Sequence, residues 1–209
     1  RKKGLIIKGK TNKNVKVLAF ERVEDVLFSP DLIIISVKSY DTENAVNEIK
    51  KIIGKNTFVM SLQNGLDNIE KIEKIVDKKK LFVCITTHGS VFTKPGVIIH
   101  TGIGKTKIGA IVKNLFDETR FVEMFNKSGI NTVISDDIMH DIWSKGVVNS
   151  SINPLTCFFR CKNGYILKNP ILKKLMEQVC YESVSVANAY GFSLVYEDTL
   201  NFTKEVISD

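Results

Sequence analysis

A chain of 209 residues, of which 44% are hydrophobic, can bury the core of one large domain or two small ones. It has no apolar run of the roughly eighteen residues that a membrane span needs, and its basic start lacks the features of a signal peptide. The net charge of +7 lies mostly in the first 30 residues, but only four of the thirty cations are arginine and no aromatic residues are interleaved with them. We therefore expect a cytoplasmic globular protein that binds neither nucleic acid nor membrane and mildly attracts anionic small molecules.

The first part of the chain alternates between predicted strands and helices. Residues 31–38, DLIIISVK, are apolar and β-branched without alternation, which is typical of a strand buried on both faces of a parallel sheet. Such strands and amphipathic helices then follow one another in β-α-β-α-β order, which predicts a parallel α/β sheet. The predicted strands are 4–8, 15–21, 31–38, 57–62 and 81–87, and the predicted helices are 41–53 and 66–76.

Polar residues follow three of the predicted strands. Lys38 ends the predicted strand 31–38, and Gln63-Asn64-Gly65 follows the predicted strand 57–62. Thr87-His88-Gly89 lies at the end of the predicted strand 81–87. Each alone could be an ordinary strand-ending polar residue. Because ligands of parallel α/β sheets bind beyond the carboxyl ends of the strands, three polar ends at one edge favour a binding site there.

The segment Gly102 to Thr106, GIGKT, is similar to a phosphate-binding loop. However, Ile99 stands where the P-loop pattern requires a glycine, and Lys107 stands where the dinucleotide fingerprint requires one. The surrounding residues 97–111, VIIHTGIGKTKIGAI, alternate like strands and open no helix. We therefore predict a β-hairpin at the edge of the sheet instead of a phosphate site.

From about residue 135 the sequence becomes helical. Asp136 and Asp137 favour the amino end of a helix, Asn163-Gly164 offers a turn, and residues 170–190 and 194–207 have helical patterns. We therefore predict two domains, residues 1–135 with an incomplete Rossmann-type sheet and residues 136–209 with helices alone.

Residues 140–163, HDIWSKGVVNSSINPLTCFFRCKN, place several polar side chains on one arc of an otherwise apolar helix. Lys145, Asn149 and Asn153 are spaced at i, i+4 and i+8. The arc could be a solvated helix face. Asparagine is a poor helix former, so two of them in register with a lysine favour a cleft that holds an oxygen-rich small molecule. The predicted polar arc also includes Ser150 and Thr156, and the predicted apolar arc is Val147, Val148, Ile152, Leu155, Phe158 and Phe159.

The cysteines and histidines show no pattern of a metal site. Because the cysteines have apolar or helical surroundings and no C-x-x-C pair, we expect reduced thiols without zinc or disulfides. His100 and His140 lack the spaced partners of a metal site or a catalytic triad, so we expect both to be structural. The four cysteines are Cys84, Cys157, Cys161 and Cys180.

Four blocks of this sequence resemble the ketopantoate reductase family. They are SVKSYDT, SLQNGLDNIEKI, TTHGSVFTKPGVIIHTGIGKTKIG and DIWSKGVVNSSINPLTCFFRCKNG, and they lie between about residues 30 and 170. The resemblance implies a Rossmann domain followed by a helical domain similar to that of 6-phosphogluconate dehydrogenase, in a homodimer. It also implies reduction of the keto acid 2-dehydropantoate to pantoate with NADPH, on the way to pantothenate and coenzyme A.

The resemblance also implies roles for particular residues. Lys145 matches the proton donor of the family. Lys38 matches a residue that contacts the cofactor, and Asn64 one that contacts cofactor and substrate. Ser90 falls where a backbone contact to the cofactor is expected. The residues that match the substrate-binding asparagines are Asn149, Asn153 and Asn163.

Two parts of the family pattern have no counterpart in these residues. The family begins with a strand and a G-x-G-x-x-G turn that receives the cofactor's pyrophosphate, whereas RKKGLIIKG resembles the segment after the second strand. The serine and glutamate of the family's substrate site should follow Asp209. NADPH preference is therefore implied only by the resemblance, and NAD remains possible. Two alternatives also remain: another hydroxyacid dehydrogenase of the same superfamily, and a non-catalytic module that has lost cofactor binding.

We expect residues 1–209 alone to show no reduction of 2-dehydropantoate and no tight binding of NADPH. Without the glycine turn there is no helix amino terminus for the pyrophosphate, and the few contacts of Lys38 and Asn64 cannot offset the loss of rotational and translational freedom. The exposed sheet edge should also favour self-association. Calorimetric titration with NADPH measures the binding, and micromolar affinity would contradict this expectation.

Overall fold

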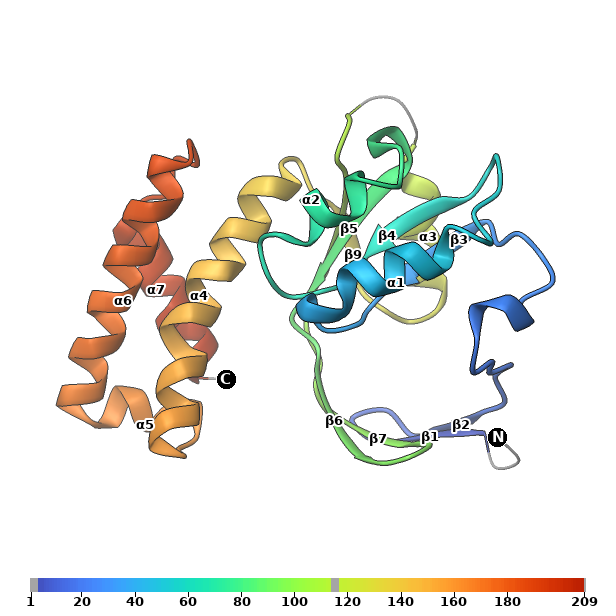
Figure 1. The fold of residues 1–209 in the computed structure, drawn as a ribbon. Helices are drawn as coiled ribbons and strands as arrows, with labels where there is room; N and C mark the ends of the chain where they lie inside the picture. The colour runs from blue at the N-terminus through green and yellow to red at the C-terminus, as the bar shows by residue number, and fades with distance from the viewer. Residues whose placement is uncertain (1–3, 114–116, 209) are drawn as a thin grey trace. The chain divides into compact units, whose positions relative to one another are not determined.

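The computed structural model describes residues 4–113 and 117–208. The chain divides into two compact units, residues 1–138 and 139–209 (Figure 1). Among the described residues, the first unit contains all the strands and the second contains helices alone. The predicted fold class, a Rossmann-type α/β sheet followed by a helical domain, is therefore confirmed.

The first unit is built around a five-stranded sheet with the order β3-β4-β5-β8-β9. The strands β3, β4 and β5 are parallel, β8 is antiparallel to β5, and β9 is parallel to β8. These strands are β3 (Leu32–Ile35), β4 (Phe58–Ser61), β5 (Leu81–Thr86), β8 (Thr106–Ala110) and β9 (Thr132–Ile134). The connections contain α1 (Thr42–Ile49), α2 (Asn68–Glu73) and α3 (Thr119–Lys127), with short 3-10 helices η1 (Val23–Asp25), η2 (Ser39–Asp41) and η3 (Lys78–Lys80).

Helices cover both faces of this sheet. Met60 and Phe82 are fully buried and pack with Phe121 of α3, whose ring lies edge-on to that of Phe82 at 4.8 Å. Side chains alternate between the faces of a strand, so Val59 and Leu81, which are also fully buried, lie on the other face. Figure 1 shows α1 and α2 on that side. Two covered faces explain why β4 and β5 have continuous apolar sequences.

A second, four-stranded sheet has the order β2-β1-β7-β6. Its strands are β1 (Leu5–Gly9), β2 (Lys13–Val15), β6 (Gly89–Lys94) and β7 (Val97–Gly102). Strand β1 is antiparallel to β2 and parallel to β7, whereas β6 and β7 form an antiparallel hairpin. The chain therefore leaves the five-stranded sheet after β5 and returns to it with β8.

The predicted hairpin over residues 97–111 is wrong. Both strands exist, but β7 pairs with β1 and β6, whereas β8 pairs with β5 and β9. The segment between β7 and β8 crosses the segment that follows β5. There, Thr87 N donates to Lys105 O at 3.0 Å, and Lys105 N donates to Thr87 Oγ1 at 2.9 Å. A Cβ on Gly104 would lie 2.4 Å from the carbonyl carbon of Thr87, so this close crossing requires glycine. Local alternation predicted the strands but not their partners.

Two other predicted strands differ from the structure. Of the predicted strand 15–21, only Val15 lies in β2. Strand β3 was expected to be buried on both faces, but it lies at the edge of the described sheet, and Ile34 is 41% exposed. In the first unit, the helix α3 and the strands β6 and β9 were not predicted.

The second unit consists of α4 (Ile138–Phe159), α5 (Asn163–Lys168), α6 (Pro170–Ala189) and α7 (Tyr196–Ser208). Asn169 caps α6, because its Oδ1 accepts from the backbone N–H groups of Ile171 and Leu172 at 3.0 and 3.2 Å. Pro170 occupies the first helical position, where the missing N–H costs nothing. The core of the unit includes Val147, Val148, Ile152, Ile166, Met176, Cys180 and Leu200.

A pair of histidines joins the turn after β5 to β7. His88 Nδ1 lies 3.0 Å from His100 Nε2, which also lies 2.8 Å from the carbonyl oxygen of Gly102. We infer that His100 Nε2 carries a hydrogen, because a carbonyl oxygen can only accept. His100 Nδ1 lies 2.9 Å from Thr11 Oγ1, so the pair also reaches the β1–β2 turn. These contacts give His100 the structural role expected of it.

The stability of the first unit should decrease in acid because of this pair. Burial lowers the pKa of His88 from its ordinary value of 6.5, and the neighbouring His100 lowers it further. The unfolded chain then binds more protons than the folded chain, so the free energy of unfolding falls as the pH drops below about 6.5 and levels off below the folded pKa. Urea unfolding at about pH 7.5 and about pH 5.5 measures this change. The variant His88→Gln should show a smaller change, and an identical pH dependence would exclude His88 as its source.

Candidate functional site

Lys38 and Asn64 lie at the carboxyl edge of the five-stranded sheet. Lys38 follows β3 and precedes η2, and Asn64 follows β4, so the two residues leave neighbouring parallel strands. Ser39 Oγ donates a hydrogen bond of 2.7 Å to the carbonyl oxygen of Asn64, which ties the two segments together. Both side chains are exposed. The fold therefore presents an ammonium and an amide at the edge where ligands of such sheets bind.

Behind this edge lies a group of buried polar residues that sequence reasoning did not single out. Thr42 is fully buried and Asn68 is 3% exposed, and Thr42 Oγ1 donates to Asn68 Oδ1 at 2.8 Å. They begin α1 and α2. Next to this group, Asp67 forms a 2.7 Å ion pair with Lys71. The hydrogen bond and the charge of Lys71 hold the pKa of the Asp67 carboxyl below its usual value. Sequence reasoning could have found this group from one signal. A short polar residue begins each of two helices, and these helices follow neighbouring strands.

Ser90 is elsewhere in the first unit. It lies on β6 in the four-stranded sheet, where it is exposed and stands opposite His100 of β7. It is therefore not on the sheet that carries Lys38 and Asn64.

In the second unit, Lys145, Asn149 and Asn153 lie on α4 as predicted. Lys145 and Asn149 are half-buried, and Asn153 is exposed. The side chain of Ser151 is fully buried on the inner side of the helix, where its Oγ donates to Val147 O at 2.8 Å. Exposure thus increases along the row from the lysine towards the second asparagine.

Three details of α4 differ from the predicted arcs. Ser150 Oγ lies 2.9 Å from Ser183 Oγ of α6, so Ser150 faces a neighbouring helix and is not part of the polar arc. On the predicted apolar arc, Phe158 is 81% exposed and Phe159 is 46% exposed. Their rings contact each other edge-on at 5.1 Å, beyond the end of the buried core. Helical periodicity gives the face of a residue but not whether another helix covers that face.

Asn163 does not continue α4. The helix ends at Phe159, and Arg160 adopts a left-handed backbone conformation with φ of 49°, which turns the chain. Asn163 is then the first residue of α5 and is exposed. The predicted Asn163-Gly164 turn is therefore wrong, because these residues begin a helix.

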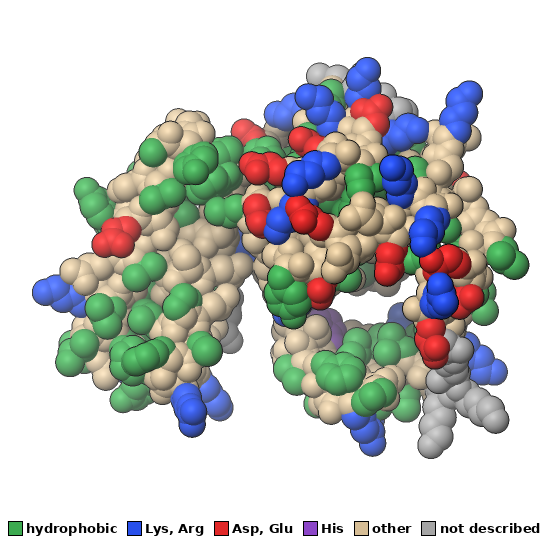
Figure 2. Space-filling model, in the orientation of Figure 1, with side chains coloured by type: hydrophobic (Ala, Val, Ile, Leu, Met, Phe, Trp, Pro, Cys, Tyr) green, Lys and Arg blue, Asp and Glu red, His purple; other side chains and the backbone are tan. Residues whose placement is uncertain are grey.

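The surface of the second unit carries many exposed apolar side chains, several of which Figure 2 shows in green. Contiguous apolar surface is uncommon on a monomer, and where it occurs it marks contacts with other protein surfaces. The exposed apolar residues of α5, α6 and α7 are Tyr165, Ile171, Leu175, Tyr181, Val186 and Phe202.

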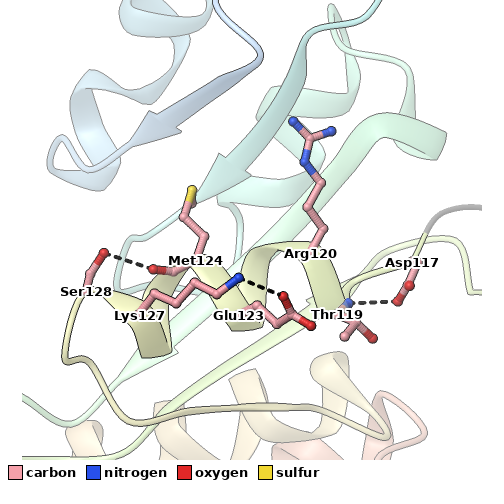
Figure 3. Close-up of a pocket in the computed structure, with 7 residues that line it drawn as sticks. All are labelled: Asp117, Thr119, Arg120, Glu123, Met124, Lys127 and Ser128. Carbon is pink, nitrogen blue, oxygen red and sulfur yellow. Dashed lines mark hydrogen bonds and ion pairs between the residues drawn. The ribbon is translucent and has the colours of Figure 1, made fainter.

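A pocket along α3 has no role in this site (Figure 3). Its polar groups bond within their own segment: Lys127 pairs with Glu123 at 3.1 Å, and Thr119 N donates to Asp117 Oδ1 at 2.9 Å. None of the predicted site residues lines it. Its polar groups do not converge on a common point, as a ligand site requires.

The described residues contain no group of three or more potential ligands that could hold a metal ion. None of the helices in residues 4–113 and 117–208 is long and apolar enough to cross a membrane. All four cysteines are free thiols. Burial raises the pKa of Cys180, which keeps this core thiol protonated and unreactive.

Comparison with known families decides the relationship. The family model described as ketopantoate reductase PanE/ApbA matches residues 1–113, and its C-terminal model matches residues 137–208. The chain belongs to the ketopantoate reductase family. A 2-dehydropantoate 2-reductase of Pyrococcus horikoshii is 37% identical over 191 residues, which are 91% of this chain and 62% of that protein. One of Aquifex aeolicus is 37% identical over 175 residues, which are 82% of this chain and 56% of that protein.

Solved structures show the same fold. A D-mandelate dehydrogenase with NADH and anilino(oxo)acetate has a TM-score of 0.91 and 22% identity, covering 99% of this chain and 67% of that one. A 2-dehydropantoate 2-reductase from Geobacter metallireducens has a TM-score of 0.86 and 23% identity, and the match covers 97% of this chain and 69% of that one. This chain thus spans about three fifths of the length of the relatives from P. horikoshii and A. aeolicus. The family prediction is confirmed, and the roles of the individual site residues stay predictions.

Proposed function

We propose that the full-length protein reduces 2-dehydropantoate to pantoate with NADPH. The row of Lys145, Asn149 and Asn153 on one side of α4 is the observation that carries this proposal. The 37% identity to proteins named 2-dehydropantoate 2-reductase supports it. The reaction belongs to pantothenate and coenzyme A biosynthesis, and we place it in the cytoplasm.

A nicotinamide cofactor suits the edge that carries Lys38 and Asn64. The exposed ammonium can pair with a phosphate or hydroxyl oxygen, and the exposed amide can donate and accept hydrogen bonds. Both residues leave the carboxyl ends of parallel strands, where dinucleotides bind in this class of fold. Ser90 would add a backbone contact. When bound, the cofactor supplies the hydride, and comparing NADPH with NADH in the same assay tests the preference.

Lys145 is the proposed proton donor. Hydride addition to a ketone leaves an alkoxide oxygen, and an ammonium within hydrogen-bond reach stabilises the developing charge and transfers a proton to it. Half-burial of Lys145 strengthens this interaction, because less water screens it. The amides of Asn149, Asn153 and Asn163 can hold the carboxylate and hydroxyl groups of the substrate without adding a competing charge.

A second candidate is reduction of a different keto acid. It is suggested by the D-mandelate dehydrogenase structure, a protein named for a different substrate that shares the fold of this chain. A comparison of kcat/KM for 2-dehydropantoate and for an aromatic 2-keto acid separates the two candidates. Activity on neither substrate would favour a non-catalytic module.

We also propose that the protein is a homodimer. The exposed apolar side chains of α5, α6 and α7 support a protein contact, and the structure of the Staphylococcus aureus relative is described as a dimeric ketopantoate reductase. Analytical ultracentrifugation of the full-length protein tests this assembly.

Replacing Lys145 by alanine in the full-length protein should lower kcat by about two or more orders of magnitude, the usual effect of losing a positioned acid. The affinity for the cofactor should change little, because Lys145 is predicted to act on the keto acid. Steady-state kinetics with 2-dehydropantoate measures both quantities.

The matched control for that variant is Lys174→Ala, which removes an exposed lysine from α6 of the same unit. It should keep the kcat of the unmodified enzyme. An undiminished kcat in Lys145→Ala would remove Lys145 from the role of proton donor.

Replacing Asn149 or Asn153 by alanine should raise the KM for the keto acid. A hydrogen bond to a charged group contributes about 1.5 to 3 kcal/mol, which corresponds to roughly a ten- to hundredfold rise. The KM for the cofactor should change much less and serves as the internal control. If both variants bind and reduce the keto acid normally, the row is only a solvated helix face.

A further inference from the structure

The backbone on both sides of Lys38 is held by side chains from the neighbouring segment. Gln63 Nε2 donates to the carbonyl oxygen of Val37 at 2.8 Å. Lys71 Nζ donates to the carbonyl oxygen of Ser39 at 3.2 Å. The position of Lys38 at the sheet edge therefore depends on residues that follow β4 and not only on its own strand.

The backbone of Asn64 is held by one side chain from the Lys38 segment and by one from the start of α2. Its carbonyl oxygen accepts two hydrogen bonds, from Ser39 Oγ at 2.7 Å and from Asn68 Nδ2 at 2.9 Å. The next residue, Gly65, has φ of +112°, and a Cβ there would lie 2.7 Å from Ser39 Oγ. The turn that presents Asn64 thus packs directly against the segment that presents Lys38.

Two hydrogen bonds of the Thr42 hydroxyl connect these two sets of contacts. Thr42 Oγ1 donates to Asn68 Oδ1 at 2.8 Å and accepts from Gln63 Nε2 at 2.9 Å. The amide of Asn68 is thereby fixed in one orientation, with its oxygen towards Thr42 and its nitrogen towards Asn64. A rotated amide would place its oxygen against the carbonyl oxygen of Asn64, so that two acceptors would face each other without a donor, which is costly.

We propose that Thr42 and Asn68 are positioning residues, which hold Lys38 and Asn64 as a pair in the geometry that binds the nicotinamide cofactor. Neither side chain can touch a ligand itself, because Thr42 is fully buried and Asn68 is 3% exposed. The inference rests on the proposed function, which makes Lys38 and Asn64 cofactor contacts.

Thr42→Val and Thr42→Ser in the full-length protein form a matched test. Valine keeps the shape of threonine and removes the hydroxyl, whereas serine keeps the hydroxyl and removes the methyl group. We expect Thr42→Val to raise the KM for NADPH about five- to tenfold, the effect of losing one or two buried hydrogen bonds, while kcat changes less than about threefold. Thr42→Ser should keep the KM for NADPH of the unmodified enzyme, which a role in packing alone would not produce.

Ser39→Ala provides a milder second variant, because it removes one donor to Asn64 O and little buried volume. It should raise the KM for NADPH in the same direction. An unchanged KM in Thr42→Val and Ser39→Ala, with the unmodified enzyme active, would overturn the positioning role and leave the proposed function intact.

Hydrogen–deuterium exchange of residues 62–68 separates this inference from the proposed function. If the unmodified protein does not reduce 2-dehydropantoate, the proposed function fails. Exchange that is faster in Thr42→Val than in Thr42→Ser would still support the positioning of this segment. Equal exchange in the two variants would overturn it, whatever the activity.

Discussion

The parallel pairing of β3, β4 and β5 is the constraint on which the first unit depends. Each parallel strand must be followed by a connection that returns the chain to the other end of the sheet, and here α1 and α2 provide it. The segments that leave β3 and β4 therefore emerge side by side at one edge. Polar residues far apart in the sequence, such as Ser39 and Asn64, come within hydrogen-bond distance for this reason.

In the second unit, buried hydroxyl groups find acceptors within their own helices. Ser151 and Thr203 are fully buried, and each donates to a carbonyl oxygen four residues earlier in its own helix, at 2.8 and 2.7 Å. The inner side of α4 can thus bury a polar residue at little cost. The row from Lys145 to Asn153 lies on a different side, where exposure increases towards the second asparagine.

Strong local patterns made much of the fold predictable. The continuous apolar runs of β4 and β5 identified buried strands, and Pro170 after Asn169 marks the start of α6. Strand pairing was not predictable, because the alternation around Gly104 is the same whether β7 and β8 pair or separate. The exposure of Phe158 was also beyond reach, since it depends on where the neighbouring helices end.

The candidate site was predictable where one element carries several residues, and where polar residues end neighbouring strands, as Lys38 and Asn64 do. Lys145, Asn149 and Asn153 share a helix, so their spacing reveals their common side. Thr42 and Asn68 lie 26 residues apart and meet only because β3 and β4 are neighbours. Sequence spacing has no information on such a contact, whereas the sheet topology implies it.

The excursion of the chain between β5 and β8 begins and ends at the same place. Thr86 and Thr106 are directly paired, and their hydroxyl oxygens lie 2.9 Å apart. Residues 87–105 therefore form an insert between two fixed, adjacent anchor points, and the register of β5 with β8 does not depend on the length of the insert. A change in the length or shape of the β6–β7 hairpin would therefore leave the register of the five-stranded sheet intact and would act instead on β1, which pairs with β7.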